Sequence, residues 1–484
     1  MSNLFKKRTK IIATYGPSCK NIKVIEHLIQ NGTDLFRLNM SHNDDPQELA
    51  TIVKNIRKTA KKLDKHVGIF CDLQGPKIRV GEFSNGPVHL KKNNLVTLTS
   101  EKVDCTDKKM FVDYKNIAND VKIGDVVYID DGKLSLTVSK VDNNDVICKI
   151  NVGGKVSNHK GVNFPHTVLS IPAFTEKDKK DTLTGIKLGI DYIALSFVST
   201  KYDVVSFKEY LYNSGGNDIK VISKIEKKQA VENYLGIIEQ SDAIMVARGD
   251  LGVEVGIEHV PKLQKEIVQE CNKKIKPVIV ATQMLESMIH STTATRAEVS
   301  DIANAIYDNC DAVMLSGETA VGIDPANVVK VMSEICSAAD LHLIKMKQET
   351  IMYRKKIFEF DTVATSICKA ADQIAEENDA RVVMSFTSSG NTPLIASKIN
   401  STIPIISPTD DENICRRMSL YKGVTPMMMP KMYSDIQRWT DMIKIAVKHA
   451  LNLEWVSKGD RIVVTAGIPI GQSNGINSIR IINI

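Results

Sequence analysis

The sequence has no run of residues long and apolar enough to cross a bilayer, which predicts that no segment spans a membrane. Its nine cysteines form no Cys-x-x-Cys pair and no regular spacing, so neither a zinc site nor a disulfide framework is indicated. The opening residues, MSNLFKKRTK, lack the apolar segment of a cleaved signal. Together these absences predict a cytoplasmic protein in a reducing compartment.

The sequence also has little excess of charge of either sign. It contains 63 Lys and Arg residues against 57 Asp and Glu residues, a formal net charge of +6 over 484 residues. A balance this small does not demand a nucleic-acid-binding surface and suits small anionic ligands equally well. We find no Walker phosphate loop, no GxGxxG dinucleotide fingerprint and no internal repeat. We therefore expect a globular protein without a nucleic-acid partner.

Short apolar strands alternate with helical segments through most of the chain. Strand-like runs occupy residues 10–16 and 34–41, followed by VGIFCDLQ, DYIALSFV, IKVISKIE, AIMVARGD, PVIVATQM and AVMLSGET. A strand, a helix and another strand in succession indicate parallel pairing. Eight nearly continuous apolar strands of this kind predict an α/β fold, a (β/α)₈ TIM barrel rather than an open doubly wound sheet.

Two regions depart from this alternation. Between residues 74 and 165 the runs VTLTS, VVYID and LSLTVSKV alternate in polarity, which predicts a small β-barrel domain inserted as a lid over one end of the TIM barrel. Toward the end of the chain, helices alternate with RVVMSFTSS, IPIISPT and DRIVVTAG, a three-layer α/β pattern. The predicted division is barrel 1–74 and 165–345, lid 75–164, and C-terminal effector and oligomerisation domain 346–484.

Polar and charged side chains gather where the predicted barrel strands end. Active sites of such barrels lie at the C-terminal ends of the strands, so these side chains are expected around one mouth. A single charged residue there is often part of a structural ion pair, but so many together favour a functional site. The residues are Arg37, Asn39, Ser41, Asp72, Lys224, Glu226, Arg248, Asp250, Thr282, Ser316 and Glu318.

The combination of carboxylates and cations at one mouth indicates a particular chemistry. Two carboxylates supply the hard oxygen ligands that Mg²⁺ prefers, and the ion takes its remaining ligands from water and substrate. Cations at the same place stabilise negative charge on a transferring phosphoryl group. The residues by themselves therefore predict a metal-assisted reaction on a small phosphorylated anion.

Nine segments, spread over most of the chain, resemble signature blocks of the pyruvate kinases and occur in that family's order. They are TKIIATYGPS, FRLNMSH, DLQGPKIR, HKGVNFP, ISKIE, MVARGDLGVE, ATQMLESM, TRAEVSDIANA and AVMLSGETA. The resemblance implies a glycolytic phosphotransferase that moves a phosphoryl group from phosphoenolpyruvate to ADP, giving pyruvate and ATP. It also implies a homotetramer.

The resemblance assigns roles to individual residues. Glu226 and Asp250 are expected to hold Mg²⁺, with Mn²⁺ as an alternative, and Lys224 to stabilise the phosphoryl group in transfer. The other expected roles are phosphate binding by Arg37 and Arg79; carboxylate binding by the backbone of Gly249 and Asp250 with Thr282; nucleotide binding by Arg37, Arg79, Lys160, Ser196 and Phe197; and a proton relay through Thr282, Ser316 and Glu318.

One position in the DLQGPKIR block departs from the K⁺-dependent members of the family. Their K⁺ is held by residues matching Asn39, Ser41, Asp72 and the backbone of the next position, here Leu73, and they carry GPEIR where this chain has GPKIR. The ammonium of Lys77 replaces a carboxylate that needs a cation. We therefore expect activity without K⁺, against the alternative that Lys77 is only a solvated loop residue.

A loop in the C-terminal region resembles the family's effector loop and predicts a site for a phosphorylated activator. Hydroxyl and backbone N–H groups ahead of a helix suit a phosphate, although Ser and Thr are equally preferred there as helix caps. The family usually has a basic residue where Asn391 stands, so the activator is left unnamed. The loop residues are Thr387, Ser388, Ser389, Gly390, Asn391 and Thr392.

Two other functions remain open from the residues alone. A Mg²⁺-dependent barrel lyase or aldolase acting on a pyruvate enolate would also hold its metal with Glu and Asp beside a carboxylate site. A catalytically silent regulator that binds phosphorylated metabolites would keep the site without the reaction. The inserted lid and the pair Lys224 and Glu226 favour phosphoryl transfer over both.

Overall fold

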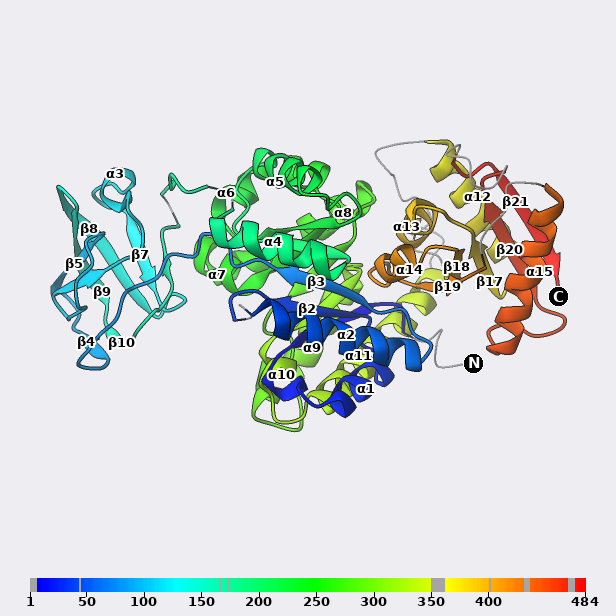
Figure 1. Cartoon of the computed structure of the whole chain (residues 1–484), viewed down its shortest axis with the longest axis horizontal. Helices are drawn as coiled ribbons and strands as arrows, with labels where there is room; N and C mark the ends of the chain where they lie inside the picture. The colour runs from blue at the N-terminus through cyan, green and yellow to red at the C-terminus, as the bar shows by residue number, and fades with distance from the viewer. Residues whose placement is uncertain are drawn as a thin grey trace.

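The computed structural model describes residues 7–42, 45–165, 167–172, 174–349, 362–399, 402–430, 436–468 and 475–484. Figure 1 shows the inserted domain at one end of an elongated molecule, the barrel in the middle and the C-terminal domain at the other end. The insertion leaves the barrel after β3 and returns to it before α4.

Eight parallel strands close into the central barrel in the order β1-β16-β15-β14-β13-β12-β3-β2. Every residue of β1, β3, β12, β14, β15 and β16 is buried. Strands enclosed by side chains inside and helices outside are apolar on both faces, which is why they appear as continuous apolar runs. The predicted barrel fold is confirmed. The strands are β1 (Lys10–Tyr15), β2 (Leu35–Asn39), β3 (Gly68–Asp72), β12 (Tyr192–Leu195), β13 (Lys220–Ile225), β14 (Ala243–Ala247), β15 (Val278–Ala281) and β16 (Ala312–Leu315).

Local sequence signals set the ends of the barrel helices. Thr175 and Asp178 form a reciprocal capping box at the start of α4, and Gly189, with φ of 61°, ends that helix. Thr295 and Glu298 form the same box at the start of α9. The helices are α1 (Ile22–Gln30), α2 (Pro46–Lys62), α4 (Glu176–Leu188), α5 (Lys201–Asn213), α6 (Lys228–Gln240), α7 (Arg248–Val255), α8 (Val260–Lys273), α9 (Arg296–Tyr307), α10 (Gly317–Ala320) and α11 (Pro325–Glu349).

The inserted domain is a six-stranded sheet, in the order β11-β7-β8-β9-β5-β6, with a separate two-stranded ribbon of β10 and β4. Its apolar side chains form a core of their own, separate from the barrel core. The alternating polarity of its strands reflects one buried and one solvated face. The elements are β4 (Val88–Leu90), β5 (Leu95–Thr99), β6 (Lys109–Phe111), α3 (Ile117–Asp120), β7 (Val126–Ile129), β8 (Leu134–Asp142), β9 (Asp145–Val152), β10 (Gly154–Val156) and β11 (Val162–Asn163).

The C-terminal domain is a five-stranded sheet in the order β19-β18-β17-β20-β21, in which only β21 is antiparallel to its neighbour. Figure 1 shows helices on both sides of this sheet, which confirms the predicted α/β domain. The elements are α12 (Val363–Glu377), β17 (Val382–Ser385), α13 (Asn391–Ile399), β18 (Ile405–Thr409), α14 (Glu412–Met418), β19 (Val424–Met428), α15 (Ile436–Asn452), β20 (Arg461–Ala466) and β21 (Ser478–Asn483).

The C-terminal domain closes the end of the barrel opposite the mouth. Met418, at the end of α14, and Leu420, just after it, share one apolar cluster with barrel residues such as Phe70 and Tyr192. The hydroxyl of Tyr192 donates a 2.6 Å hydrogen bond to the carbonyl oxygen of Arg417. The C-terminal domain therefore covers this end of the barrel. The other end, where the strands terminate, is the mouth.

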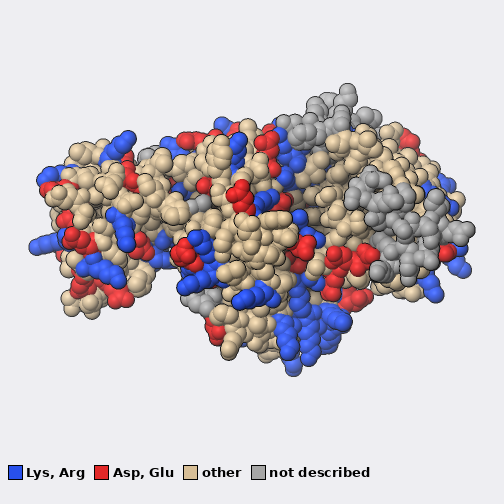
Figure 2. All heavy atoms as spheres, turned by 45° about the horizontal axis from the view of Figure 1, so that its top comes forward, with Lys and Arg blue, Asp and Glu red and all other residues tan. Residues whose placement is uncertain are grey.

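Charged side chains of both signs are interspersed over the face drawn in Figure 2, with one basic cluster at the lower edge of the barrel. This distribution agrees with the near balance of acidic and basic residues in the sequence. None of the helices in the described part of the chain is both long enough and apolar enough to span a membrane.

Each of the predicted barrel strands runs past the end that the structure gives it, and β2 and β16 are two examples. β2 ends at Asn39, so Ser41 lies in the following turn, where its N–H donates to Asn39 Oδ1 at 3.2 Å. β16 ends at Leu315, and Glu318 lies in the short helix α10. In both places the apolar run ends earlier than the motif does, because the backbone turns to form the mouth.

A buried ion pair joins the C-terminal domain to the barrel and predicts a large stability effect. Lys398 of α13 pairs with Asp311, which also accepts a 2.7 Å hydrogen bond from the N–H of Val278. Because Lys398→Met would leave the buried carboxylate without its cation, we expect a loss of about 3–5 kcal/mol in unfolding free energy. Chemical denaturation with urea measures this as a lower midpoint.

The matched control is Lys62→Met, which breaks a pair with Glu26 at 2.9 Å on the surface, where the Lys62 side chain is 67% exposed. Exposed pairs contribute little, so its midpoint should correspond to a change below about 1 kcal/mol. Equal effects of the two substitutions would contradict the structural role given to Lys398.

Candidate active site

The centre of the barrel mouth is a buried carboxylate between two cations. Arg37 Nε lies 2.6 Å from Asp72 Oδ2, and Lys224 Nζ lies 3.5 Å from Asp72 Oδ1. Ser196 Oγ accepts a 2.8 Å hydrogen bond from the same Lys224 ammonium and donates one of 2.7 Å to the carbonyl oxygen of Leu73. Four strands, β2, β3, β12 and β13, therefore bring these predicted residues together.

The charges of this group support one another. Burial alone would raise the pKa of Asp72, but Lys224 and Arg37 hold it below its usual value. Burial alone would lower the pKa of Lys224, but Asp72 and Glu226 raise it above its usual range. At neutral pH the mouth therefore contains a fixed ammonium, a fixed guanidinium and an ionised carboxylate.

Glu226 is fully buried, and one of its oxygens lacks a hydrogen bond. Its Oε1 accepts a 2.6 Å hydrogen bond from the N–H of Phe197, which has φ of 57°. Its Oε2 lies 3.1 Å from Lys224 Nζ but makes no hydrogen bond within the described structure. Burial raises the pKa of Glu226, and the neighbouring Asp250 adds to this while Lys224 opposes it. A carboxylate in this state is suited to a cationic ligand.

The turn between β14 and α7 faces the turn after β15. Asp250 lies in the first turn of α7, and the N–H of Gly249 donates a 2.8 Å hydrogen bond to Thr282 Oγ1. That hydroxyl in turn donates to the carbonyl oxygen of Ala281 at 2.6 Å. Backbone N–H groups at the start of a helix attract anions. The predicted carboxylate-binding group of Gly249, Asp250 and Thr282 is therefore assembled at one point.

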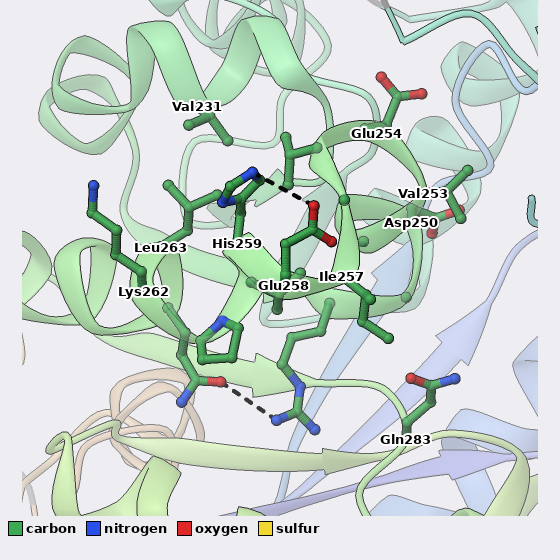
Figure 3. Close-up of a pocket in the computed structure, with 18 of the residues that line it drawn as sticks. Val231, Asp250, Val253, Glu254, Ile257, Glu258, His259, Lys262, Leu263 and Gln283 are labelled. Carbon is green, nitrogen blue, oxygen red and sulfur yellow. Dashed lines mark hydrogen bonds and ion pairs between the residues drawn. The ribbon is translucent and has the colours of Figure 1, made fainter. Parts of the chain in front are cut away.

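The lid contacts the barrel beside this point. Lys77 Nζ lies 3.7 Å from Asp250 Oδ1, and Asn163 Nδ2 donates a 3.0 Å hydrogen bond to Glu254 Oε1 of α7. A cavity of about 1830 Å³ lies against these elements and extends along α7 and α8. Figure 3 shows Asp250 and Glu254 on one side of this cavity and Lys262 on the other. The cavity has room for substrates larger than a single small anion.

Two other predicted cations belong to the lid in this conformation. Arg79 Nη1 donates a 3.0 Å hydrogen bond to the carbonyl oxygen of His159, and Lys160 Nζ lies 2.8 Å from Asp130 Oδ1. The contacts given for both side chains are within the lid. Their roles in phosphate and nucleotide binding stay predictions.

Glu318, one of the predicted proton-relay residues, already accepts hydrogen bonds from the backbone. Glu318 is fully buried, and its two oxygens accept hydrogen bonds from the N–H groups of Leu285 at 3.1 Å and Ser316 at 2.6 Å. Both bonds hold backbone segments that follow β15 and β16. Glu318 therefore braces the mouth, and its role in a relay stays a prediction.

The predicted effector loop lies far from the mouth, in the C-terminal domain. Thr387 Oγ1 accepts hydrogen bonds from the N–H groups of Ser389 at 3.3 Å and Gly390 at 2.9 Å, and Gly390 has φ of 85°. Ser388 and Ser389 are exposed ahead of α13, and Asn391 is exposed as its first residue. The loop is thus preformed by its own hydroxyl, as in ordinary capping, while its exposed side supports a phosphate site equally.

Sequence reasoning missed the lid contact of Glu254 and the partner of Lys77. Asn163 and Glu254 both lie inside recognised motifs, HKGVNFP and MVARGDLGVE, but no sequence pattern pairs residues 91 positions apart. Lys77 was expected beside Asn39, Ser41 and Asp72, and the ion pair that the structure gives it is with Asp250.

Within the described residues, no group of three or more His, Cys, Asp or Glu side chains is arranged to hold a metal ion. The predicted metal ligands are two carboxylates, Glu226 and Asp250, while a third carboxylate at the mouth, Asp72, is held between Arg37 and Lys224. This donor set fits an ion that takes most of its ligands from water and substrate, as Mg²⁺ does, and does not resemble an all-protein Zn²⁺ or Ca²⁺ site.

These features together define a class: a (β/α)₈-barrel enzyme with a charged mouth beneath an inserted lid. Comparison with known families is more specific. Residues 6–329 match the model of the barrel domain of pyruvate kinase, and residues 365–482 match the model of its alpha/beta domain. The chain belongs to the pyruvate kinase family and is a phosphotransferase, as its motifs predicted.

Individual relatives agree over the whole length. The chain is 41% identical to pyruvate kinase 2 of Synechocystis sp. over 479 residues, covering 98% of this chain and 79% of that one. It is 40% identical to pyruvate kinase of Corynebacterium glutamicum over 483 residues, covering 98% of this chain and 97% of that one. A crystal structure of a pyruvate kinase from Cryptosporidium parvum superposes with a TM-score of 0.91 at 33% identity, covering 99% of this chain and 97% of that one.

The burial of Glu254 predicts a pH-dependent stability. Burial raises the pKa of Glu254, although its hydrogen bond from Asn163 opposes this. A carboxyl whose pKa is higher in the folded state stabilises the fold when protonated, and this contribution is lost as pH rises from the ordinary value through the raised one. Glu254→Gln keeps an acceptor for Asn163 and removes the titration.

We therefore expect Glu254→Gln to gain stability over the unmodified protein as pH rises from 4.5 to 7.5. Melting temperatures of both proteins across this range measure the difference. Glu258→Gln, at an exposed side chain on the same cavity, is the control and should show no such trend. A difference that shrinks with rising pH would contradict the expected direction.

Proposed function

We propose that this chain transfers the phosphoryl group of phosphoenolpyruvate to ADP with Mg²⁺, and that it does so without K⁺. The observation that carries the proposal is the group of Lys224, Glu226, Asp72 and Arg37 beside the anion-binding turn of α7. In the reaction an ADP phosphate oxygen attacks phosphorus, the bond to the enol oxygen breaks, and the enolate takes a proton at carbon to become pyruvate.

Glu226 and Asp250 are the residues that would hold the metal. Glu226 Oε2 supports this, because within the described residues it accepts no hydrogen bond and has the Lys224 ammonium on one side at 3.1 Å, so it can accept a second cation as a ligand. When bound, Mg²⁺ supplies positive charge that neutralises phosphate oxygens during transfer. Mn²⁺ has the same preference for oxygen ligands and is the alternative.

The protein's own groups bind and orient the substrates. We assign the carboxylate of phosphoenolpyruvate to the N–H groups of Gly249 and Asp250 and the hydroxyl of Thr282, and its phosphate to Arg37 and Lys224. The fixed positive charge of Lys224 stabilises the phosphoryl oxygens without reorganising during the reaction. Ser196 holds the Lys224 ammonium at 2.8 Å and so orients it.

The lid completes the site when it closes. Arg79 and Lys160, now bonded within the lid, would then reach the nucleotide phosphates beside Arg37, with Ser196 and Phe197 at the base of the nucleotide site. Closure excludes water, which otherwise competes with ADP for the phosphoryl group. Thr282, Ser316 and Glu318 would orient the water that protonates the enolate.

The wider setting follows the family. We propose a cytoplasmic homotetramer in which residues 346–484 form the effector and oligomerisation domain, residues 75–164 the lid, and residues 1–74 and 165–345 the barrel. The effector loop from Thr387 to Thr392 would take the phosphate of an activator. The exposed side chains of Ser388 and Ser389 just ahead of α13 support this role.

Independence from K⁺ is supported by the state of the oxygens that would hold the ion. Asp72 already has two cations, the carbonyl oxygen of Leu73 accepts from Ser196, and Asn39 Oδ1 accepts from the N–H of Ser41. Lys77 adds a further positive charge at Asp250. The fixed cations therefore supply the field that a bound K⁺ would supply.

The role of Lys224 predicts a large catalytic loss on substitution. Lys224→Met removes the charge that stabilises the transferring group, so kcat for pyruvate formation should fall by about 10²–10³-fold. A coupled assay with phosphoenolpyruvate, ADP and Mg²⁺ measures it. Lys262→Met removes an exposed cation from the side of the cavity opposite Asp250 and should change kcat by less than about twofold.

Pyruvate formation that does not require ADP would point to a lyase and overturn the proposed function. The same assay of the unmodified protein, with and without ADP, provides this answer.

The role of Lys77 predicts equal rates, within about twofold, in buffers containing K⁺ or a large inert cation. Lys77→Glu should create a K⁺ requirement, because the added carboxylate needs a cation. Lys133→Glu, at an exposed lid lysine paired with Asp130, is the control and should not. Strong K⁺ dependence of the unmodified protein, or none in Lys77→Glu, would contradict the proposal that Lys77 replaces K⁺. Neither result would contradict the proposed kinase reaction.

A further inference from the structure

The turn after β15 has an unfavourable backbone conformation at the substrate site. Thr282 has φ of 72° and Gln283 has φ of 54°, both in the left-handed region. Residues other than glycine rarely adopt this region, and a β-branched residue such as Thr does so least readily. Such a conformation is unfavourable for these residue types and persists only where surrounding contacts fix it.

The contacts that fix this turn come largely from one side chain. Arg248, the first residue of α7, donates from Nη2 to the carbonyl oxygen of Thr282 at 2.7 Å and from Nε to that of Ala281 at 3.3 Å. One guanidinium thus holds two successive carbonyls of the strained turn. The planar arrangement of its donors is suited to this in a way that an ammonium is not.

Arg248 is itself held from two further helices. Its Nη1 lies 2.7 Å from Asp301 Oδ2 of α9 and 3.4 Å from Gln264 Oε1 of α8, and its side chain is only 10% exposed. Gln264 is oriented by its own 3.0 Å hydrogen bond to Asp308. The guanidinium is therefore a buried, paired cation with a fixed direction.

We call the two hydrogen bonds from Arg248 to the carbonyl oxygens of Ala281 and Thr282 the clamp. The position of Arg248 in the chain connects this clamp to the proposed carboxylate site at the start of α7. The next residue is Gly249, whose N–H bonds Thr282 Oγ1, and the one after is Asp250. Figure 3 shows Gln283 and Asp250 facing the same side of the cavity. Both halves of the carboxylate-binding group, the start of α7 and the Thr282 hydroxyl, are thus fixed to each other through one side chain.

We propose that Arg248 is a positioning residue that holds the Thr282 turn in its left-handed conformation and so fixes the Thr282 hydroxyl beside the N–H of Gly249, at the proposed site of the substrate carboxylate. The inference rests on the role proposed for Thr282. Arg248 does not touch the reacting atoms, and its effect passes through the backbone of residues 281–283. Its charge is neutralised by Asp301, so the clamp acts by geometry rather than by attracting the substrate.

The test is a double-mutant cycle between Arg248→Lys and Thr282→Ala. Arg248→Lys keeps the charge and loses the two-carbonyl clamp, so kcat/KM for phosphoenolpyruvate should fall about tenfold or more while KM for ADP changes by less than about twofold. In the Thr282→Ala background, where this hydroxyl is absent, Arg248→Lys should lower kcat/KM for phosphoenolpyruvate by less than a further factor of about two.

A glycine at the next position distinguishes the clamp from a general structural role. Gln283→Gly adopts positive φ without strain, so in the Arg248→Lys background it should restore kcat/KM for phosphoenolpyruvate by about threefold or more. Lys262→Met, which removes an exposed cation paired with Glu266 on α8, is the control and should stay within about twofold of the unmodified protein.

The outcomes separate this inference from the proposed function. Additive losses in the cycle, equal effects on both substrates, or no recovery with Gln283→Gly, in a protein that makes ADP-dependent pyruvate, would overturn the clamp alone. An unmodified protein that makes no ADP-dependent pyruvate would overturn the proposed function and with it the role of Thr282.

Discussion

The carboxylate of Asp72 is buried between Arg37 and Lys224, and the arrangement of the barrel mouth depends on this one group. Asp72 is 1% exposed, and an ionised carboxylate so far from water is stable only when cations and donors surround it. The two cations come from β2 and β13, which are not adjacent to each other in the barrel. β2 pairs directly with β3, which carries Asp72, whereas Lys224 reaches Asp72 from β13 across the intervening strand β12.

Other features of the site follow from the same centre. Lys224 is held by Asp72 and Ser196, and this fixes the ammonium beside Glu226. Glu226 Oε1 accepts a hydrogen bond from the N–H of Phe197, and its Oε2 accepts none within the described residues. The barrel strands supply the charges at the mouth, while the inserted domain adds contacts to α7, such as those of Lys77 with Asp250 and of Asn163 with Glu254.

The sequence was most informative where residues act close to a strand. Arg37, Asp72, Lys224, Glu226 and Thr282 were placed correctly at the mouth because parallel strands all end on the same side of a barrel. It was less informative where the backbone turns. Ser41 and Glu318 were expected to continue strands, but turns and a short helix intervene, and these are set by contacts with other elements.

By itself, the sequence determined the barrel, the insertion, the C-terminal domain and the family. Barrel strands are buried on both faces and therefore appear as continuous apolar runs, and the family motifs are long enough to be recognised. Only the tertiary structure decided that Lys77 pairs with Asp250, that Glu254 meets Asn163 of the lid, and that Arg248 holds the carbonyls of Ala281 and Thr282. Each of these contacts joins residues distant in the chain, and side-chain direction across such a distance depends on packing that no local pattern encodes.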